Sequence, residues 1–272
     1  MKTAFILIVV ILFSFFILYP IWIGITGSLK PDEDFLAAPA FVFPDNPTLE
    51  KYIEAWDVLK RALFFSFKIA ITTMALAIVV GVIGGYLLSQ HHNFKGLKLL
   101  LILCVFGIYI PGVSKLIPII KIVQIFRLLD TPWGVGIALG SMQLPIATIL
   151  YRQFFLKFPK SFFEVAEISG ADHIQILRNI IIPLAKTPTM TVAILSISIG
   201  WNNLLFPLVL TSSETSTVTV AITSLVYEAK QYSVYNKLLA GTIIAALPVA
   251  ILYLIFQSRV TSGFRQLGGA SK

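Results

Sequence analysis

The chain alternates between long apolar runs and short stretches that carry most of its charged residues. Six runs are long enough, or nearly so, to cross a hydrocarbon core about 30 Å thick, which takes about 20 helical residues. A helix satisfies its backbone hydrogen bonds within one such segment. The pattern predicts an all-α integral membrane protein of six transmembrane helices, roughly at residues 3–29, 69–90, 99–114, 131–151, 187–213 and 238–258.

Three of these runs have features that affect their assignment. The first is too long for the apolar part of a typical signal peptide, so we expect an uncleaved span rather than a removed leader. Residues 49–59 predict a short helix leading into the second run. The third run is short and is expected to continue past Lys115 to about residue 120, with the lysine facing protein, water or an interface.

A polar stretch at residues 161–184, between the fourth and fifth runs, predicts two short helices. Ser161 followed three residues later by Glu164 is a capping box, in which each residue satisfies a free backbone N–H of the first turn. Asp172 and Gln175 repeat a similar pattern. Gly170 lies between the two and can adopt the positive φ with which many helices end.

Pro183 should end the second helix because proline lacks a backbone N–H and restricts the preceding residue. Ile174, Leu177 and Ile181 are spaced to share one face of that helix. From physical reasoning alone, two short amphipathic helices between spans favour an ordinary loop packed on the bundle.

Composition supports a membrane protein and removes other classes. Of the 272 residues, 57% are hydrophobic and 12% are charged, whereas soluble domains carry about 25% charged residues. The net charge of +8 comes from scattered residues without a basic run, so nucleic-acid binding is not expected. Cys104 is the only cysteine, which excludes a disulfide within the chain, and the three histidines lack metal-ligand spacing.

The order of residues in the polar stretch resembles the EAA loop of ABC-importer permeases. The sequence differs from the family pattern at Val165, Ser169 and Ile182, and the change at Ser169 removes an acid that is common there. The resemblance implies that residues 159–184 form a cytoplasmic loop that docks on an ATPase. The match is carried by Glu164, Ala166, Gly170, Ala171, Ile180 and Pro183. The resemblance implies a docking helix that begins at Phe162, and the expected coupling residues are Phe162, Glu164, Ala166, Gly170, Ala171 and Pro183.

Other stretches resemble the sugar-type, or maltose-type, branch of these permeases. Trp201-Asn202 precedes Pro207-Leu208, although that branch often has an acid where Asn203 stands. Residues 130–134 and the tail 263–272 also match. The resemblance covers nearly the whole chain, 1–272, which implies one permease domain and a carbohydrate as the transported solute.

Polar residues within the apolar runs are candidates for a solute pathway. Amides at membrane depth must be hydrogen-bonded or hydrated, because an unsatisfied polar group in hydrocarbon costs several kcal/mol. Trp201, Asn202 and Asn203 lie in the fifth run and Gln143 lies in the fourth. Hydrogen bonding between helices is the alternative explanation for the two asparagines, and Gln143 is a candidate because of its depth in the run alone.

The sequence lacks the groups that an enzyme or a proton-driven carrier would use. It has no phosphate-binding loop, no set of residues for covalent or acid–base catalysis, no acidic relay within the runs, and no residues for a cofactor of its own. Energy must then come from a gradient or from another subunit. The resemblance implies the second source, with ATP used by a partner.

The resemblance further implies the partners and the location. The chain should work with a second permease subunit, two cytoplasmic ATPase subunits and an extracytoplasmic solute-binding protein in the lipid bilayer. A small excess of Lys and Arg on one side agrees with cytoplasmic N- and C-termini. We expect a multi-pass protein of a bacterial or archaeal plasma membrane. The alternatives are a permease for another small polar solute, a gradient-driven carrier, or an assembly subunit without a solute route.

Overall fold

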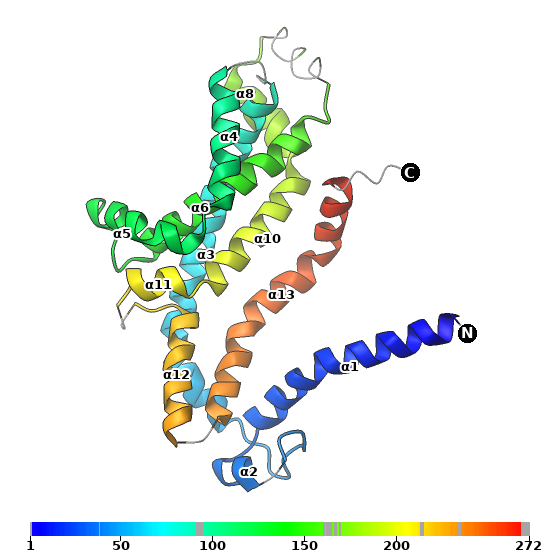
Figure 1. Cartoon of the computed structure of the whole chain (residues 1–272), viewed down its shortest axis with the longest axis vertical. Coiled ribbons are helices and arrows are strands. Elements are labelled where there is room, and N and C mark those ends of the chain that lie inside the picture. Colours follow the sequence, from blue (N-terminus) through cyan, green and yellow to red (C-terminus); the bar gives the residue numbers. More distant parts are fainter. Residues whose placement is uncertain are drawn as a thin grey trace. The chain divides into compact units, whose positions relative to one another are not determined.

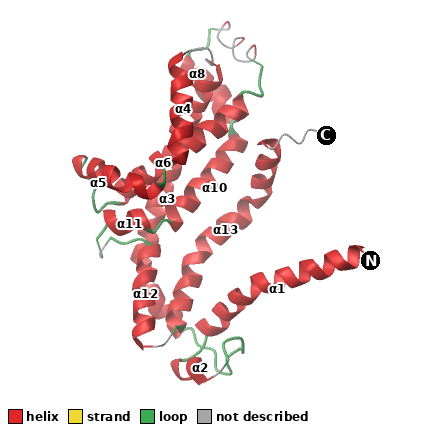
Figure 2. Cartoon of the chain, in the orientation of Figure 1, coloured by secondary structure: helices red, strands yellow, loops and turns green. Residues whose placement is uncertain are grey.

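The computed structural model describes residues 2–37, 39–90, 95–159, 161, 165, 168, 170–212, 215–232 and 235–267. These residues form helices and connecting loops, and no strand occurs among them (Figure 2). The chain divides into two compact units. Unit 1 comprises Met1–Phe64 with Thr217–Pro248, and unit 2 comprises Phe65–Ser216 with Val249–Lys272. The single permease domain over residues 1–272 stays a prediction.

Four helices among the described residues are long and apolar enough to cross a membrane, and two bent helix pairs raise the number to six if each pair is one span. This agrees with the fold class expected from the apolar runs. The second helix is longer than predicted, because residues 49–59 continue without a break into the second run. The four helices are α1 (Lys2–Ser28), α3 (Glu50–Gln90), α6 (Pro132–Phe155) and α13 (Asn236–Leu267) (Figure 1).

The third span is broken at Pro111. Helix α4 (Lys95–Tyr109) ends before this proline, and a 3₁₀ turn, η1 (Gly112–Lys115), leads into α5 (Leu116–Ile125). The axes of the two segments differ by 111°. Lys115 donates from Nζ to the carbonyl of Gly107 at 2.6 Å, so the lysine satisfies an acceptor near the end of α4. The run continues past Lys115 as predicted, but as a separate helix.

The fifth run, expected at residues 187–213, is divided between two helices. Helix α10 (Lys186–Asn202) ends, and α11 (Leu205–Leu210) begins after two intervening residues. Asn203 is extended, with ψ of 127°, and its Oδ1 accepts the N–H of Phe206 at 3.0 Å. Pro207 supplies no N–H to continue the helical ladder, so the side chain of Asn203 starts a new helix instead.

Glycine pairs hold α3 and α6 together within unit 2. A Cβ added at Gly81 would lie 2.8 Å from Cβ of Ala147, and one at Gly136 would lie 2.5 Å from Cβ of Thr72. Each helix therefore presents small residues to the other, which allows the close backbone approach that associates helices in lipid. The hydroxyl of Thr73 adds a hydrogen bond to the carbonyl of Gly136 at 3.2 Å. We call this packing the α3–α6 seam.

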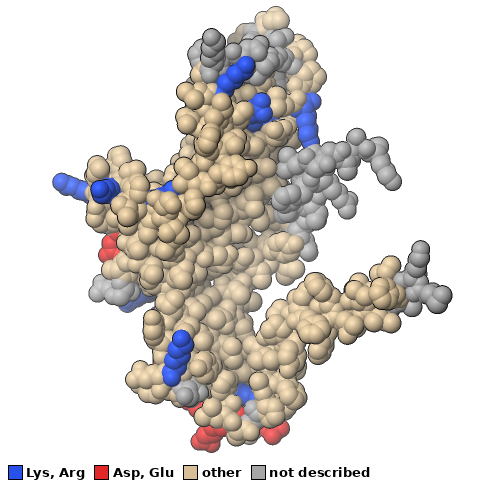
Figure 3. Space-filling model, in the orientation of Figure 1, with Lys and Arg blue, Asp and Glu red and all other residues tan. Residues whose placement is uncertain are grey.

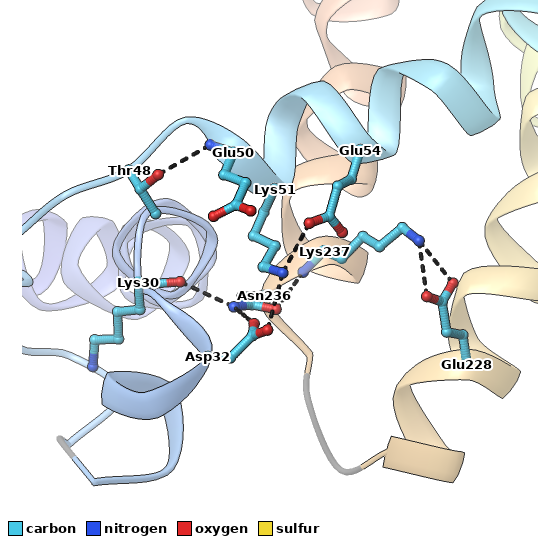
Figure 4. A network of polar contacts seen from close by, with 9 residues as sticks. All are labelled: Lys30, Asp32, Thr48, Glu50, Lys51, Glu54, Glu228, Asn236 and Lys237. Carbon is cyan, nitrogen blue, oxygen red and sulfur yellow. Dashed lines mark hydrogen bonds and ion pairs between the residues drawn. The ribbon is translucent and has the colours of Figure 1, made fainter.

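Unit 1 is connected by polar contacts around the short helix α2 (Asp32–Ala37) and the start of α13 (Figure 4). Asn236 is fully buried and donates from Nδ2 to the carbonyl of Lys30 at 2.9 Å and to Oδ1 of Asp32 at 2.7 Å. Lys51 forms ion pairs with Asp32 and Glu54, each at 3.0 Å. We call Lys30, Asp32, Lys51, Glu54 and Asn236 the polar junction.

A second ion pair lies near the junction in unit 1. Lys237 at the start of α13 donates to Glu228 at 2.8 Å. Glu228 belongs to α12 (Val218–Tyr232), which packs Leu225 against the position of Gly241. The charged groups border an open cavity of about 330 Å³. Since these acids and lysines already pair with one another, the cavity is explained as the space between the helix ends.

Candidate functional site

The loop between α6 and α10 is the best candidate for the functional site. Of the six predicted coupling residues, Phe162, Glu164 and Ala166 lie outside the described residues. Gly170 and Ala171 are described and precede a short helical segment that leads to α10. Pro183 is also described, within that segment.

The turn before this segment has the predicted local structure. Gly170 has φ of +82°, a conformation that side chains other than glycine rarely adopt. Two residues later, the N–H of Asp172 donates to Oε1 of Gln175 at 3.0 Å, and the N–H of Gln175 donates to Oδ1 of Asp172 at 2.7 Å. This reciprocal pair is a capping box, so the predicted helix start is confirmed.

The segment that follows contains a π-helical turn, which the sequence pattern did not predict. It consists of α8 (His173–Ile176), the π-helix η2 (Leu177–Ile181) and α9 (Ile182–Leu184). The N–H of Ile182 donates to the carbonyl of Leu177, a bond one residue longer than in an α-helix.

The wider turn changes which side chains face the core. Ile176 and Ile181 are buried, whereas Ile174 is 73% exposed, so the predicted face of Ile174, Leu177 and Ile181 is wrong at its first member. Pro183 was expected to end the helix, and the end comes one residue later, at Leu184. This difference is within the usual uncertainty of helix ends.

The segment is anchored to unit 2 by apolar packing. Ile176, Ile181 and Ala185 belong to one buried cluster with Tyr151 and Phe155 of α6. The Tyr151 hydroxyl also donates to Oγ1 of Thr189 in α10 at 2.8 Å. A displacement of the segment therefore reaches α6 and α10 through packed side chains, since close-packed interiors transmit strain.

The loop also carries large apolar side chains that are exposed. Val165 is 63% exposed, Ile168 is 86% exposed and Ile174 is 73% exposed. On the face drawn in Figure 3, a few Lys and Arg side chains lie at this end of unit 2, near α4 and α8. Apolar groups next to solvated charges are typical of a surface that binds another protein.

The four predicted pathway residues do not share one environment. Gln143 and Trp201 are buried, at 5% and 4% exposure. Asn203 caps α11, as described above. Asn202 is exposed at the end of α10 and donates from Nδ2 to the carbonyl of Ser198 at 2.9 Å, within its own helix. Among the four, Asn202 keeps an amide oxygen available at the break between α10 and α11.

Sequence reasoning missed Tyr151 and Phe155, which connect the loop to the seam. Their rings stack at a centroid distance of 6.4 Å, and both side chains are fully buried. The available signal was two aromatic residues four positions apart at the end of an apolar run, a spacing that places both on one helix face. That spacing alone does not say which element covers them.

Comparison with known proteins identifies the family. Residues 77–265 match the family model described as binding-protein-dependent transport system inner membrane component. The chain is 30% identical over 249 residues to the sulfoquinovosyl glycerol transport system permease protein of Agrobacterium fabrum, covering 90% of this chain and 86% of that protein. It is 32% identical over 266 residues to a probable ABC transporter permease protein of Pyrococcus horikoshii, covering 96% and 95%.

The fold agrees with a solved structure. A chain in the crystal structure of a bacterial ABC transporter involved in the import of the acidic polysaccharide alginate superposes with a TM-score of 0.80 at 22% identity, covering 94% of this chain and 95% of that chain. With the family match over most of the sequence, these findings confirm the resemblance that the loop indicated. The chain belongs to the family of inner membrane components of binding-protein-dependent transport systems, the permeases of ABC importers.

Proposed function

We propose that the chain is a permease subunit for carbohydrate import and that residues 159–184 couple it to a cytoplasmic ATPase. Two of these ATPase subunits, a second permease subunit and an extracytoplasmic solute-binding protein complete the transporter. ATP is bound and hydrolysed by the ATPase, and this chain binds no cofactor. The N- and C-termini and the loop are cytoplasmic, in the plasma membrane of a bacterium or archaeon.

The observation that carries the proposal is the two-sided character of the loop. Ile176 and Ile181 are anchored in the core of unit 2, whereas Ile168 and Ile174 face outward. A segment fixed on one side and apolar on the other can bind a partner and pass its movement to the spans. ATP-driven closure of the ATPase then shifts the equilibrium between inward-open and outward-open states, because each state favours one ATPase geometry.

Carbohydrate is proposed as the solute from the names of similar permeases. Relatives include the sulfoquinovosyl glycerol permease above and the trehalose transport system permease protein of Mycobacterium tuberculosis, which is 29% identical over 239 residues. Asn202, Asn203, Trp201 and Gln143 are proposed to line the route. Another small polar solute is the alternative, and uptake assays with a panel of labelled sugars and other solutes separate the two.

The coupling role is tested by changing the outward face of the loop. In the purified complex, Ile174→Asp should reduce retention of the ATPase at least fivefold, because a charge replaces an apolar contact. Leu36→Asp is the matched control, since Leu36 is 70% exposed on α2 of unit 1 and its replacement should leave ATPase retention unchanged. Equal retention in both variants would refute the coupling role of this face.

The source of energy is tested in the same preparation. Proteoliposomes containing the complex, the binding protein and labelled sugar should take up sugar when ATP is supplied to the ATPase side. Ionophores that dissipate ion gradients should leave this uptake intact. Uptake that stops with the gradient at constant ATP would instead identify a gradient-driven carrier.

A further inference from the structure

An apolar groove lies in unit 2 where α3 passes the corner between α9 and α10. The bent pair 174–184 and 186–202 turns by 76°, and residues of both segments line the groove together with residues of α3. The groove has a volume of about 400 Å³. Its walls are formed by Ile78, Val79, Val82 and Ile83 of α3 and by Leu177, Ile182, Pro183, Lys186 and Thr189.

The dimensions and chemistry of the walls suit a single hydrocarbon chain. Residues 78–83 span about 8 Å along α3. Val79 and Ile182 are 56% and 51% exposed, so the walls are not closed by other side chains of this chain. Oγ1 of Thr189 already accepts a hydrogen bond from the Tyr151 hydroxyl. The interior therefore offers an apolar surface with few polar groups for a ligand.

The rim of the groove is basic. Lys186 lines it and is exposed, and Arg178 is exposed on the preceding π-helical turn. Among the described residues, no carboxylate forms an ion pair with either side chain. Lys186 also stands at the start of α10, where a cation is disfavoured by the helix dipole. An anion bound beside the groove would offset this unfavourable interaction.

We propose that this groove binds one acyl chain of an anionic glycerophospholipid whose phosphate pairs with Lys186. A basic pocket between transmembrane helices favours anionic head groups. The same groove touches Ile182 and Pro183 next to the loop, so a bound lipid would support the corner that connects the loop to α10. The proposal concerns lipid binding by the permease and does not depend on which solute is transported.

The test uses the intact complex in nanodiscs that contain phosphatidylglycerol with a photoreactive group on one acyl chain. Cross-linked peptides should include residues 78–83 and 182–183. Lys186→Glu should reduce this labelling at least fivefold, whereas Lys98→Glu should not change it. Lys98 is an exposed lysine of α4 that does not line the groove.

A second pair of variants tests the groove itself. Val79→Trp should fill it and reduce labelling, whereas Val80→Trp should not, because Val80 is exposed on the same helix but does not line the groove. The proposal is overturned if a phosphatidylethanolamine probe labels residues 78–83 and 182–183 as strongly as the phosphatidylglycerol probe does. It is also overturned if the Lys186→Glu and Val79→Trp variants are labelled as strongly as the unchanged chain. Cross-linking of the groove to the second permease chain would also overturn it, since a protein would then cover the site.

Discussion

The α3–α6 seam of unit 2 and the polar junction of unit 1 hold helices together by different means. The seam uses Gly81, Gly85, Gly136 and Gly140, at which an added Cβ would come within 3 Å of the facing helix. The junction uses Asn236 and charged residues near the ends of helices. Lipid is as apolar as leucine, so helices within it associate through close packing, whereas groups near water can use hydrogen bonds and ion pairs.

The difference has a consequence for function. A seam of close backbone contacts does not tolerate larger side chains, and its two helices move together. Such a rigid pair can pass on a movement of the loop, which follows α6 in the chain. The ion pairs of the junction join the buried Lys51 to Asp32 and Glu54, whose side chains are 53% and 37% exposed, so these pairs can exchange partners with water at small cost. We therefore expect substitutions in the seam to affect stability more than substitutions in the junction.

The largest loss of stability is expected from a substitution at Gly85. A Cβ there would lie 2.4 Å from Cβ of Tyr151 and 2.8 Å from the backbone nitrogen of Arg152, which cannot move aside without shifting α6. Gly85→Ala should lower the free energy of unfolding in detergent by about 2–3 kcal/mol, as for an overpacked core. Gly24→Ala is the control, because nothing lies within 4 Å of its Cβ position, and it should be neutral or stabilising. Similar stability of the two variants would contradict the close seam.

An intermediate effect is expected at Asn236. Asn236→Leu removes the donor to Lys30 and Asp32 and leaves a carbonyl without that partner, at a cost of about 1–3 kcal/mol. Asn202→Leu should change the free energy of unfolding by less than about 0.5 kcal/mol, because Asn202 is exposed and bonds only within its own helix. Chemical unfolding of both variants in the same detergent makes the comparison. A loss at Asn236 that exceeds the loss at Gly85 would reverse the proposed ranking of the two regions.

The smallest effect is expected from acidification of the junction. The hydrogen bond from Asn236, helped by Lys51, holds the pKa of Asp32 below its usual value, against the opposing effect of burial. A lowered pKa in the folded state stabilises the fold above the unfolded pKa of about 4, and this contribution is lost as the pH falls through the folded value. Hydrogen exchange of residues 30–54 should therefore increase on acidification below pH 4 in the unchanged chain and less so in Asp32→Asn. The same increase in hydrogen exchange in both chains would show that ionised Asp32 does not stabilise residues 30–54.

The features that sequence reasoning predicted well are local ones. Gly170 and the Asp172–Gln175 capping box depend on residues within a few positions of one another, and the structure has both. The apolar runs located the helices for the same reason, because a membrane span is specified within one segment.

The features that were missed depend on contacts between distant parts of the chain. Asn236 bonds to Lys30, 206 positions away, and no local pattern specifies that pair. The π-helical turn at Leu177–Ile181 was not visible in a periodicity that assumes 3.6 residues per turn. Asn203 was interpreted as a polar pathway residue in the fifth run, because the capping role of its side chain becomes evident only with the helix end.

The central claim is that the outward face of the loop binds the ATPase on the cytoplasmic side, and site-specific cross-linking tests it directly. A photoreactive amino acid at Ile168 or Ile174 should cross-link to the ATPase subunit in membranes that contain the whole transporter. The same group at Leu36 serves as the control and should not. Cross-links from the loop to the extracytoplasmic binding protein, or none to the ATPase from either position, would contradict the account.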